Sequence, residues 1–178
     1  MEQVRDVQRR LPLLRKNVYA VTAIDLPLDD VIHISYDGQK ILGTRLAEIA
    51  LTYVYNKPNH GKQINLESIE VFDVPSPYIK LRYNGITGRL LSQGRPADFE
   101  LRIASDDDPY VVPYRTDFDI NEPCSIIIRV HKPLTASAKL VYGGGLNPYA
   151  NIIDEAGMAV PAFGPIELPG PGTIKRVE

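Results

Sequence analysis

The stretch Asn17-Val18-Tyr19-Ala20-Val21-Thr22-Ala23-Ile24 decides the fold expected for the first third of the chain. It is a nearly continuous run of apolar and β-branched residues, which is typical of a parallel strand buried on both faces. Such a strand needs neighbouring strands for its backbone groups and other elements to cover its faces. The sequence therefore predicts that residues 18–24 lie inside a layered α/β arrangement.

A helix is predicted on each side of this strand. Residues 2–10 are good helix formers, and Pro12 is expected to end their helix. Beyond a loop over residues 25–35, Ser35 is a suitable N-cap for a second helix that reaches about Tyr55. The apolar residues of this second helix fall on one face: Ile41, Leu42, Leu46, Ile49, Ala50, Tyr53 and Val54.

One strand and two helices cannot complete a sheet, so residues 18–24 need a further partner. A missing N-terminal portion, a separate chain, a second copy of this chain or the β-rich remainder could supply it. Without such a partner, the apolar edge would be a site of aggregation.

After the second helix the pattern changes to short β-rich runs separated by clusters of Pro, Gly, Asn and Asp. This pattern is typical of an antiparallel β-sandwich or barrel. Strands are predicted at Ile64 to Val74, Tyr78 to Tyr83, Phe99 to Ala104, Ser125 to Val130 and Ala138 to Tyr142. The chain thus divides into residues 1–57, a β-rich domain over 58–168, and an extended or disordered tail over 169–178.

Composition narrows the classes of function. The chain has 178 residues, 44% hydrophobic content and a formal charge of −2, with Lys and Arg scattered along it. This balance argues against a nucleic-acid or anionic-membrane partner. The apolar runs are too short to span a membrane, and residues 1–10 lack the apolar core of a signal peptide, so localisation is left open. Cys124 is the only cysteine, which excludes an intrachain disulfide.

The loop after the predicted strand carries the candidate chemistry. Asp30 stands three residues before His33, at the end of a strand where open α/β folds place their catalytic groups. A carboxylate can hold the tautomer of a histidine that acts as general base in acyl transfer. An ordinary loop histidine is the alternative. Asp29 and Asp25 are rivals to Asp30, although Asp25 is expected to be structural and to bind loop amides.

Asp30-x-x-His33, followed by Gly38-Gln39, Gly43, Arg45 and Ala47, resembles the last sequence block of the SGNH/GDSL hydrolases. Asp37 and Gly38 are expected to open the helix there. Other segments are similar to carbohydrate O-acetylesterases of the sialate O-acetylesterase type: residues 4–8, 21–25, 138–148 and 151–163. The resemblance implies an α+β protein, with the last strand and helices of a flavodoxin-like α/β/α layer followed by an antiparallel β-sandwich or barrel.

The resemblance also implies a function, the O-deacetylation of sugars by a Ser-His-Asp enzyme. It implies that His33 is the general base and Asp30 its partner, and that the reaction needs neither a metal nor a cofactor. In that family the serine lies in an N-terminal Gly-Asp-Ser or Gly-x-Ser block, and two middle blocks supply a glycine and an asparagine for the oxyanion hole. None of these blocks is found here, and the serines of this chain lack the strand-turn-helix setting of a nucleophile. The chain therefore resembles the C-terminal part of such an esterase, and we expect it to be inactive by itself.

Other candidate residues favour structural roles. His60 and His131 are expected to be surface histidines, and Gly143-Gly144-Gly145 is expected to form a turn or bulge rather than a phosphate loop. The run 106–108 of three aspartates is expected to be a solvated turn, with calcium binding as the alternative.

Three tyrosines could stack on sugar rings or lie half-buried in the sheet: Tyr110, Tyr114 and Tyr149. They support an alternative function, a noncatalytic β-sandwich module that binds carbohydrate or a partner protein.

Overall fold

A computed structural model describes residues 2–103, 113–134 and 138–177 of the chain. Two helices, α1 (Glu2–Leu14) and α2 (Tyr36–Tyr53), precede a series of antiparallel strands. The protein is therefore of the mixed α+β class. No helix in the described part is long and apolar enough to cross a membrane.

The largest sheet contains five strands in the order β10-β1-β2-β6-β5. Its strands are β1 (Asn65–Phe72), β2 (Tyr78–Asn84), β5 (Pro113–Phe118), β6 (Ser125–Val130) and β10 (Ile174–Arg176). Buried residues alternate along β2, where Ile79, Leu81 and Tyr83 face inward. In β1 the buried positions jump from Leu66 to Ile69, because the pairing register shifts between Leu66 and Ser68.

Two smaller sheets complete the β-rich part. One has the order β4-β7-β9 and the other pairs β3 with β8. Their strands are β3 (Leu90–Ser92), β4 (Phe99–Ile103), β7 (Ala138–Tyr142), β8 (Ile152–Asp154) and β9 (Phe163–Glu167). Side chains of β7 and β9, such as Leu140, Tyr142 and Phe163, share one hydrophobic core with those of the five-stranded sheet.

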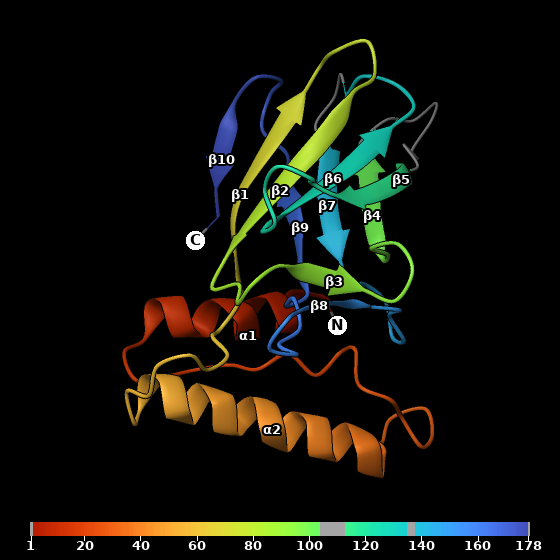
Figure 1. Cartoon of the computed structure of the whole chain (residues 1–178). Helices are drawn as coiled ribbons and strands as arrows, with labels where there is room; N and C mark the ends of the chain where they lie inside the picture. The colour runs from red at the N-terminus through yellow and green to blue at the C-terminus, as the bar shows by residue number, and fades with distance from the viewer. Residues whose placement is uncertain (1, 104–112, 135–137, 178) are drawn as a thin grey trace.

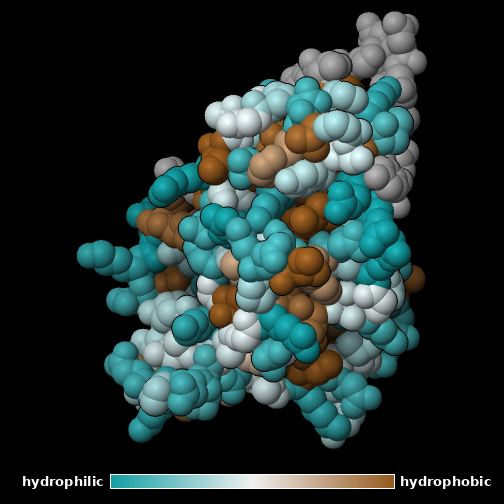
Figure 2. Space-filling model, turned by 45° about the horizontal axis from the view of Figure 1, so that its top comes forward, coloured by the Kyte–Doolittle hydropathy of each residue, from teal (hydrophilic) through white to brown (hydrophobic). Residues whose placement is uncertain are grey.

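On the face shown in Figure 2, hydrophobic residues form separate patches among hydrophilic ones, as on an ordinary solvated surface.

The structure confirms five predicted strands as β1, β2, β4, β6 and β7, although Ala104 lies outside the described residues. Five strands were not predicted, and each is short, lies at a sheet edge or contains Pro or Gly. Pro113 is tolerated in β5 and Pro165 in β9 because both are edge strands, where a missing N–H costs least. The tail, expected to be extended or disordered, contributes β10 to the five-stranded sheet.

The prediction that Pro12 ends the first helix is wrong, since α1 continues to Leu14. Pro12 lies in the last turn, and the amide of Arg15 still donates to the Leu11 carbonyl at 3.1 Å. Pro12 lacks the amide that would donate to the carbonyl of Gln8, so α1 loses one hydrogen bond there but keeps the bond from Arg15 to Leu11.

The N-terminal elements pack on the β-rich part (Figure 1). Helix α1 lies against β9, and Arg5 donates from Nη1 to the carbonyls of Gly143 and Gly145, both at 2.8 Å. Gly143 and Gly145 have φ of 68° and 71°, and the chain bends at both residues, in agreement with the predicted turn or bulge. At the end of α2, Thr52 Oγ1 donates to the carbonyl of Gly61 at 2.8 Å.

The prediction of a strand at residues 18–24 is wrong. The segment runs between α1 and α2 in Figure 1 and pairs with no strand of the described residues. Its residues are also only partly buried, and Tyr19 is 38% exposed. The apolar pattern predicted a strand buried on both faces, but none of the described strands pairs with this segment to form a ladder.

Candidate functional site

A short loop between this segment and α2 displays the two predicted site residues. The amide of Asp29 donates to the carbonyl of His33, and the amide of Ser35 donates to the carbonyl of Pro27, both at 2.9 Å. Leu28 and Ile34 form an antiparallel bridge at the base of the loop. This closure holds residues 30–33 at the tip of the loop, directly before α2.

Asp30 and His33 meet at this tip. Oδ2 of Asp30 lies 2.7 Å from Nδ1 of His33, while Oδ1 accepts the amides of Ile32 and His33, both at 2.8 Å. The hydrogen bond from His33, with the two amides, lowers the pKa of the Asp30 carboxyl below its usual value. An ionised Asp30 holds the proton of His33 on Nδ1 and leaves Nε2 as an acceptor.

The two rival aspartates lie elsewhere. Asp29 contributes a backbone amide to the loop closure, and Asp25 forms a bidentate ion pair with Arg45, at 2.7 and 2.6 Å. The expectation that Asp25 is structural is confirmed, but its partner is a guanidinium rather than loop amides.

The side chain of His33 is 72% exposed, so Nε2 is accessible to a substrate or to another group. Among the described residues, Asp30 is the only hydrogen-bonding partner of the His33 ring.

Arg45 fixes the base of the loop. Besides Asp25, it donates from Nη1 to the carbonyl of Thr22 at 2.7 Å and from Nε to the carbonyl of Gly157 at 2.8 Å. The turn that carries Gly157 is itself held by buried Asp154, whose Oδ1 accepts the amide of Met158 at 2.9 Å. Arg45 thus joins the segment before the loop, the helix after it and the β-rich part.

The start of α2 explains why the sequence has glycine at position 38. Ser35 caps the helix, its Oγ accepting the amide of Gly38 at 3.2 Å, as predicted. A Cβ atom at position 38 would lie 2.6 Å from Cγ2 of Ile34 and 2.8 Å from the carbonyl oxygen of Pro27. Glycine therefore allows the first turn of α2 to contact the base of the loop.

Replacing Gly38 with alanine is expected to destabilise the fold by about 1–3 kcal/mol, because the added methyl group overlaps Ile34 and the loop backbone. Gly43 is the matched control, since a Cβ atom there meets nothing within 4 Å. Gly43→Ala should stabilise α2 by up to about 1 kcal/mol. Urea denaturation of both variants measures these changes, and equal effects of the two would contradict this account of Gly38.

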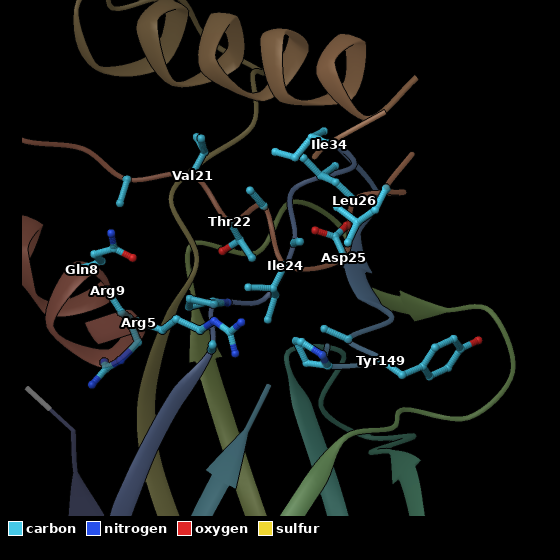
Figure 3. A pocket seen from close by; sticks show the side chains of 18 of the residues that line it. Arg5, Gln8, Arg9, Val21, Thr22, Ile24, Asp25, Leu26, Ile34 and Tyr149 are labelled. Carbon is cyan, nitrogen blue, oxygen red and sulfur yellow. The ribbon is translucent and has the colours of Figure 1, made fainter. Parts of the chain in front are cut away.

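A groove of about 570 Å³ runs along the unpaired segment and the loop. Figure 3 shows it between α2 and the ends of the strands, with Arg5, Gln8 and Arg9 toward one end and Tyr149 toward the other. Four loop residues line it, namely Leu28, Val31, Ile32 and Ile34, together with residues 20–26. Asp30 and His33 belong to the loop that forms part of its wall, but are not among its lining residues.

Apart from Tyr149, which lines the groove, the other candidates are not brought to this site by a described contact. Nδ1 of His60 lies 3.1 Å from Oε2 of Glu48, and His131 is exposed. The run 106–108 and Tyr110 lie outside the described residues, as does the side chain of Tyr114. Among the side chains that are described, no group of three or more His, Cys, Asp or Glu is placed to hold a metal ion.

Sequence reasoning did not predict the contribution of α1 to this groove. Arg9 is 5% exposed, whereas four apolar residues of the same helix are 44–65% exposed: Val4, Val7, Leu11 and Leu14. Their spacing of three or four residues places them on one stripe. The spacing alone could have identified an apolar face, but not that this face points away from the β-rich part.

Comparisons with protein-family models, with curated proteins and with solved structures found no match to this chain.

Proposed function

We propose that this chain forms the base-bearing, C-terminal part of an SGNH-type carbohydrate esterase, in which His33 is the general base and Asp30 its orienting partner. The single observation that carries the proposal is the 2.7 Å contact between Asp30 Oδ2 and His33 Nδ1 at the tip of an exposed loop. It leaves Nε2 accessible to a nucleophile. We further infer that residues 18–24 become a strand only when the remainder of the sheet is present, with α1 and α2 as the helices before and after it in an α/β/α layer.

The chemistry follows from these two residues and a serine that this proposal places outside residues 1–178. The serine Oγ attacks the ester carbonyl carbon, and its proton moves to His33 Nε2. The imidazolium, stabilised by Asp30, then donates this proton to the sugar oxygen as the acyl C–O bond breaks. Water attacks the acetyl-serine, His33 accepts a proton from it, and return of that proton to the serine oxygen releases acetate.

The test joins the N-terminal portion of an intact SGNH carbohydrate esterase, ending before the helix that precedes its last strand, to residue 2 of this chain. We expect this hybrid to release acetate from peracetylated glucose and this chain alone to release none. His33→Ala should lower kcat of the hybrid by about 10⁴-fold or more, whereas His60→Ala is the matched control and should leave it nearly unchanged.

Two outcomes would overturn the proposal. A folded hybrid that releases no acetate would remove the support for an esterase. Turnover by this chain alone, abolished by His33→Ala, would show that a nucleophile lies within it and contradict the assignment of the serine elsewhere.

A noncatalytic module that binds carbohydrate is the second candidate. Tyr149 favours it, because this side chain is 66% exposed and lines the groove, where an aromatic ring could stack on a sugar. Glycan-array binding that survives His33→Ala but is lost in Tyr149→Ala would support this function over the esterase.

A further inference from the structure

A tight turn of the β-rich part, the Asp154 turn (residues 154–158), is built around the carboxylate of Asp154, which is only 1% exposed. Its Oδ1 accepts the amide of Met158 and its Oδ2 the amide of Thr87, both at 2.9 Å. Gly157 has φ of 76°, a conformation that favours glycine, and its amide donates to the carbonyl of Asp154 at 3.0 Å. The carbonyl of Gly157 therefore has a fixed position and direction.

Arg45 of α2 joins this carbonyl to the segment before the loop. Its side chain is 4% exposed, and its Nε donates to Gly157 while Nη1 and Nη2 bind Asp25 and Nη1 also binds the carbonyl of Thr22. Because a guanidinium is planar and its donors form a rigid fork, the Gly157 carbonyl sets the direction of the remaining donors. Burial raises the pKa of Asp154, and the backbone amides and the charge of Arg45 oppose this rise. The cation thus also attracts the carboxylate that builds the turn.

The loop of His33 starts directly after this ion pair. Pro27, two residues beyond Asp25, accepts the amide of Ser35 at 2.9 Å at the base of the loop. One end of the loop is therefore fixed by Arg45 through Asp25, and the other by the first turn of α2. Because Arg45 itself rests on the β-rich part, the place of the loop relative to that part depends on the same contact.

The Asp154 turn also supplies part of the groove wall. Met158, at its end, lines the groove together with Val31 and Ile32 of the loop. A group bound in the groove would thus contact elements from both parts of the chain. Their spacing matters for catalysis, because a displacement of about 1 Å at a reacting group can lower a rate by about 10²-fold.

We infer that the Asp154 turn positions His33 against the bound ester, with Asp154 and Arg45 as positioning residues. The β-rich part is then a component of the active site rather than an appended module. The turn determines where the loop lies, whereas Asp30 determines the tautomer of His33, so the two roles separate in experiment. This inference deepens the proposed function and rests on it.

Residual dipolar couplings of the full chain test this positioning without any activity. In the unaltered chain, the amides of Ile32 and His33 should fit the same alignment tensor as those of β1 and β2. Asp154→Ala should remove this common fit while the tautomer of His33 stays unchanged. Asp119→Ala is the matched control and should preserve the fit. Asp119 also accepts a turn amide, from Asn121 at 2.9 Å, but it is not among the residues that line the groove.

The hybrid esterase measures the consequence for catalysis. Asp154→Ala should lower its kcat by about 10²-fold, after correction for the folded fraction, with an unchanged pH profile. Asp154→Asn keeps one side-chain oxygen for the turn amides but loses the bond to Thr87, so its kcat should fall only about threefold to tenfold. This milder variant decides the question if Asp154→Ala does not fold. Asp119→Ala should change kcat by less than about threefold.

Loop amides that still share the tensor of the sheet in the Asp154 variants would overturn the inference, as would an equal loss of kcat in Asp119→Ala. Loss of the common fit together with a folded hybrid that releases no acetate would support placement of the loop by the turn and contradict the esterase. Acetate release with the same kcat in both Asp154 variants would support the esterase and overturn the positioning role.

Discussion

Replacement of Asp30 by asparagine should lower kcat of the completed esterase by about 10⁴-fold while leaving the loop in place. Oδ1 of Asp30 accepts two backbone amides, and the side-chain oxygen of asparagine can preserve these bonds. The second position changes from a carboxylate oxygen to an NH2 group, which donates toward His33 Nδ1. The proton of His33 would then move to Nε2, where it blocks proton transfer from the serine.

Asp29→Asn is the matched control, because Asp29 contributes only its backbone amide to the loop. It should change kcat of the hybrid by less than about threefold, since an exposed side chain without a partner at the site affects His33 little. The tautomer of His33 gives a second readout that needs no activity, because ¹⁵N shifts distinguish protonation at Nδ1 from protonation at Nε2. A tautomer unaffected by Asp30→Asn would contradict the role assigned to Asp30.

The contact between Asp30 and His33 could be predicted from sequence because it is local. The two residues are three positions apart in one loop, and a carboxylate at that spacing reaches the imidazole once its oxygens bind the intervening amides. The capped start of α2 was predictable for the same reason. Most of the long strands could also be predicted, since two-residue alternation depends only on which face is buried.

The remaining features depend on partners distant in the chain. Arg45 was noted only as part of a motif, because its partners lie 20, 23 and 112 residues away. The strand expected at residues 18–24 failed for a related reason. An apolar β-branched run indicates where a segment prefers to lie, but a strand exists only when another backbone accepts its hydrogen bonds. That partner is absent from the described residues.

Replacement of Arg45 by methionine should cost about 3–5 kcal/mol of unfolding free energy, because it leaves the Asp25 carboxylate charged, mostly buried and unpaired. The side chains of Arg45 and Asp25 are only 4% and 10% exposed. The variant also removes the donor for the carbonyls of Thr22 and Gly157. Urea denaturation measures the loss, and a change below about 1 kcal/mol would contradict this assignment.

Two controls separate charge burial from the loss of a cation alone. Lys40→Met removes a lysine from an exposed pair with Asp37, whose side chains are 58% and 79% exposed, and should cost less than about 0.5 kcal/mol. The double variant Asp25→Leu/Arg45→Met should recover much of the stability lost in Arg45→Met, because no unpaired charge remains. Its residual cost should reflect the two unbonded carbonyls. If the double variant were as unstable as Arg45→Met, the hydrogen bonds to Thr22 and Gly157, rather than the ion pair, would dominate the stability of this site.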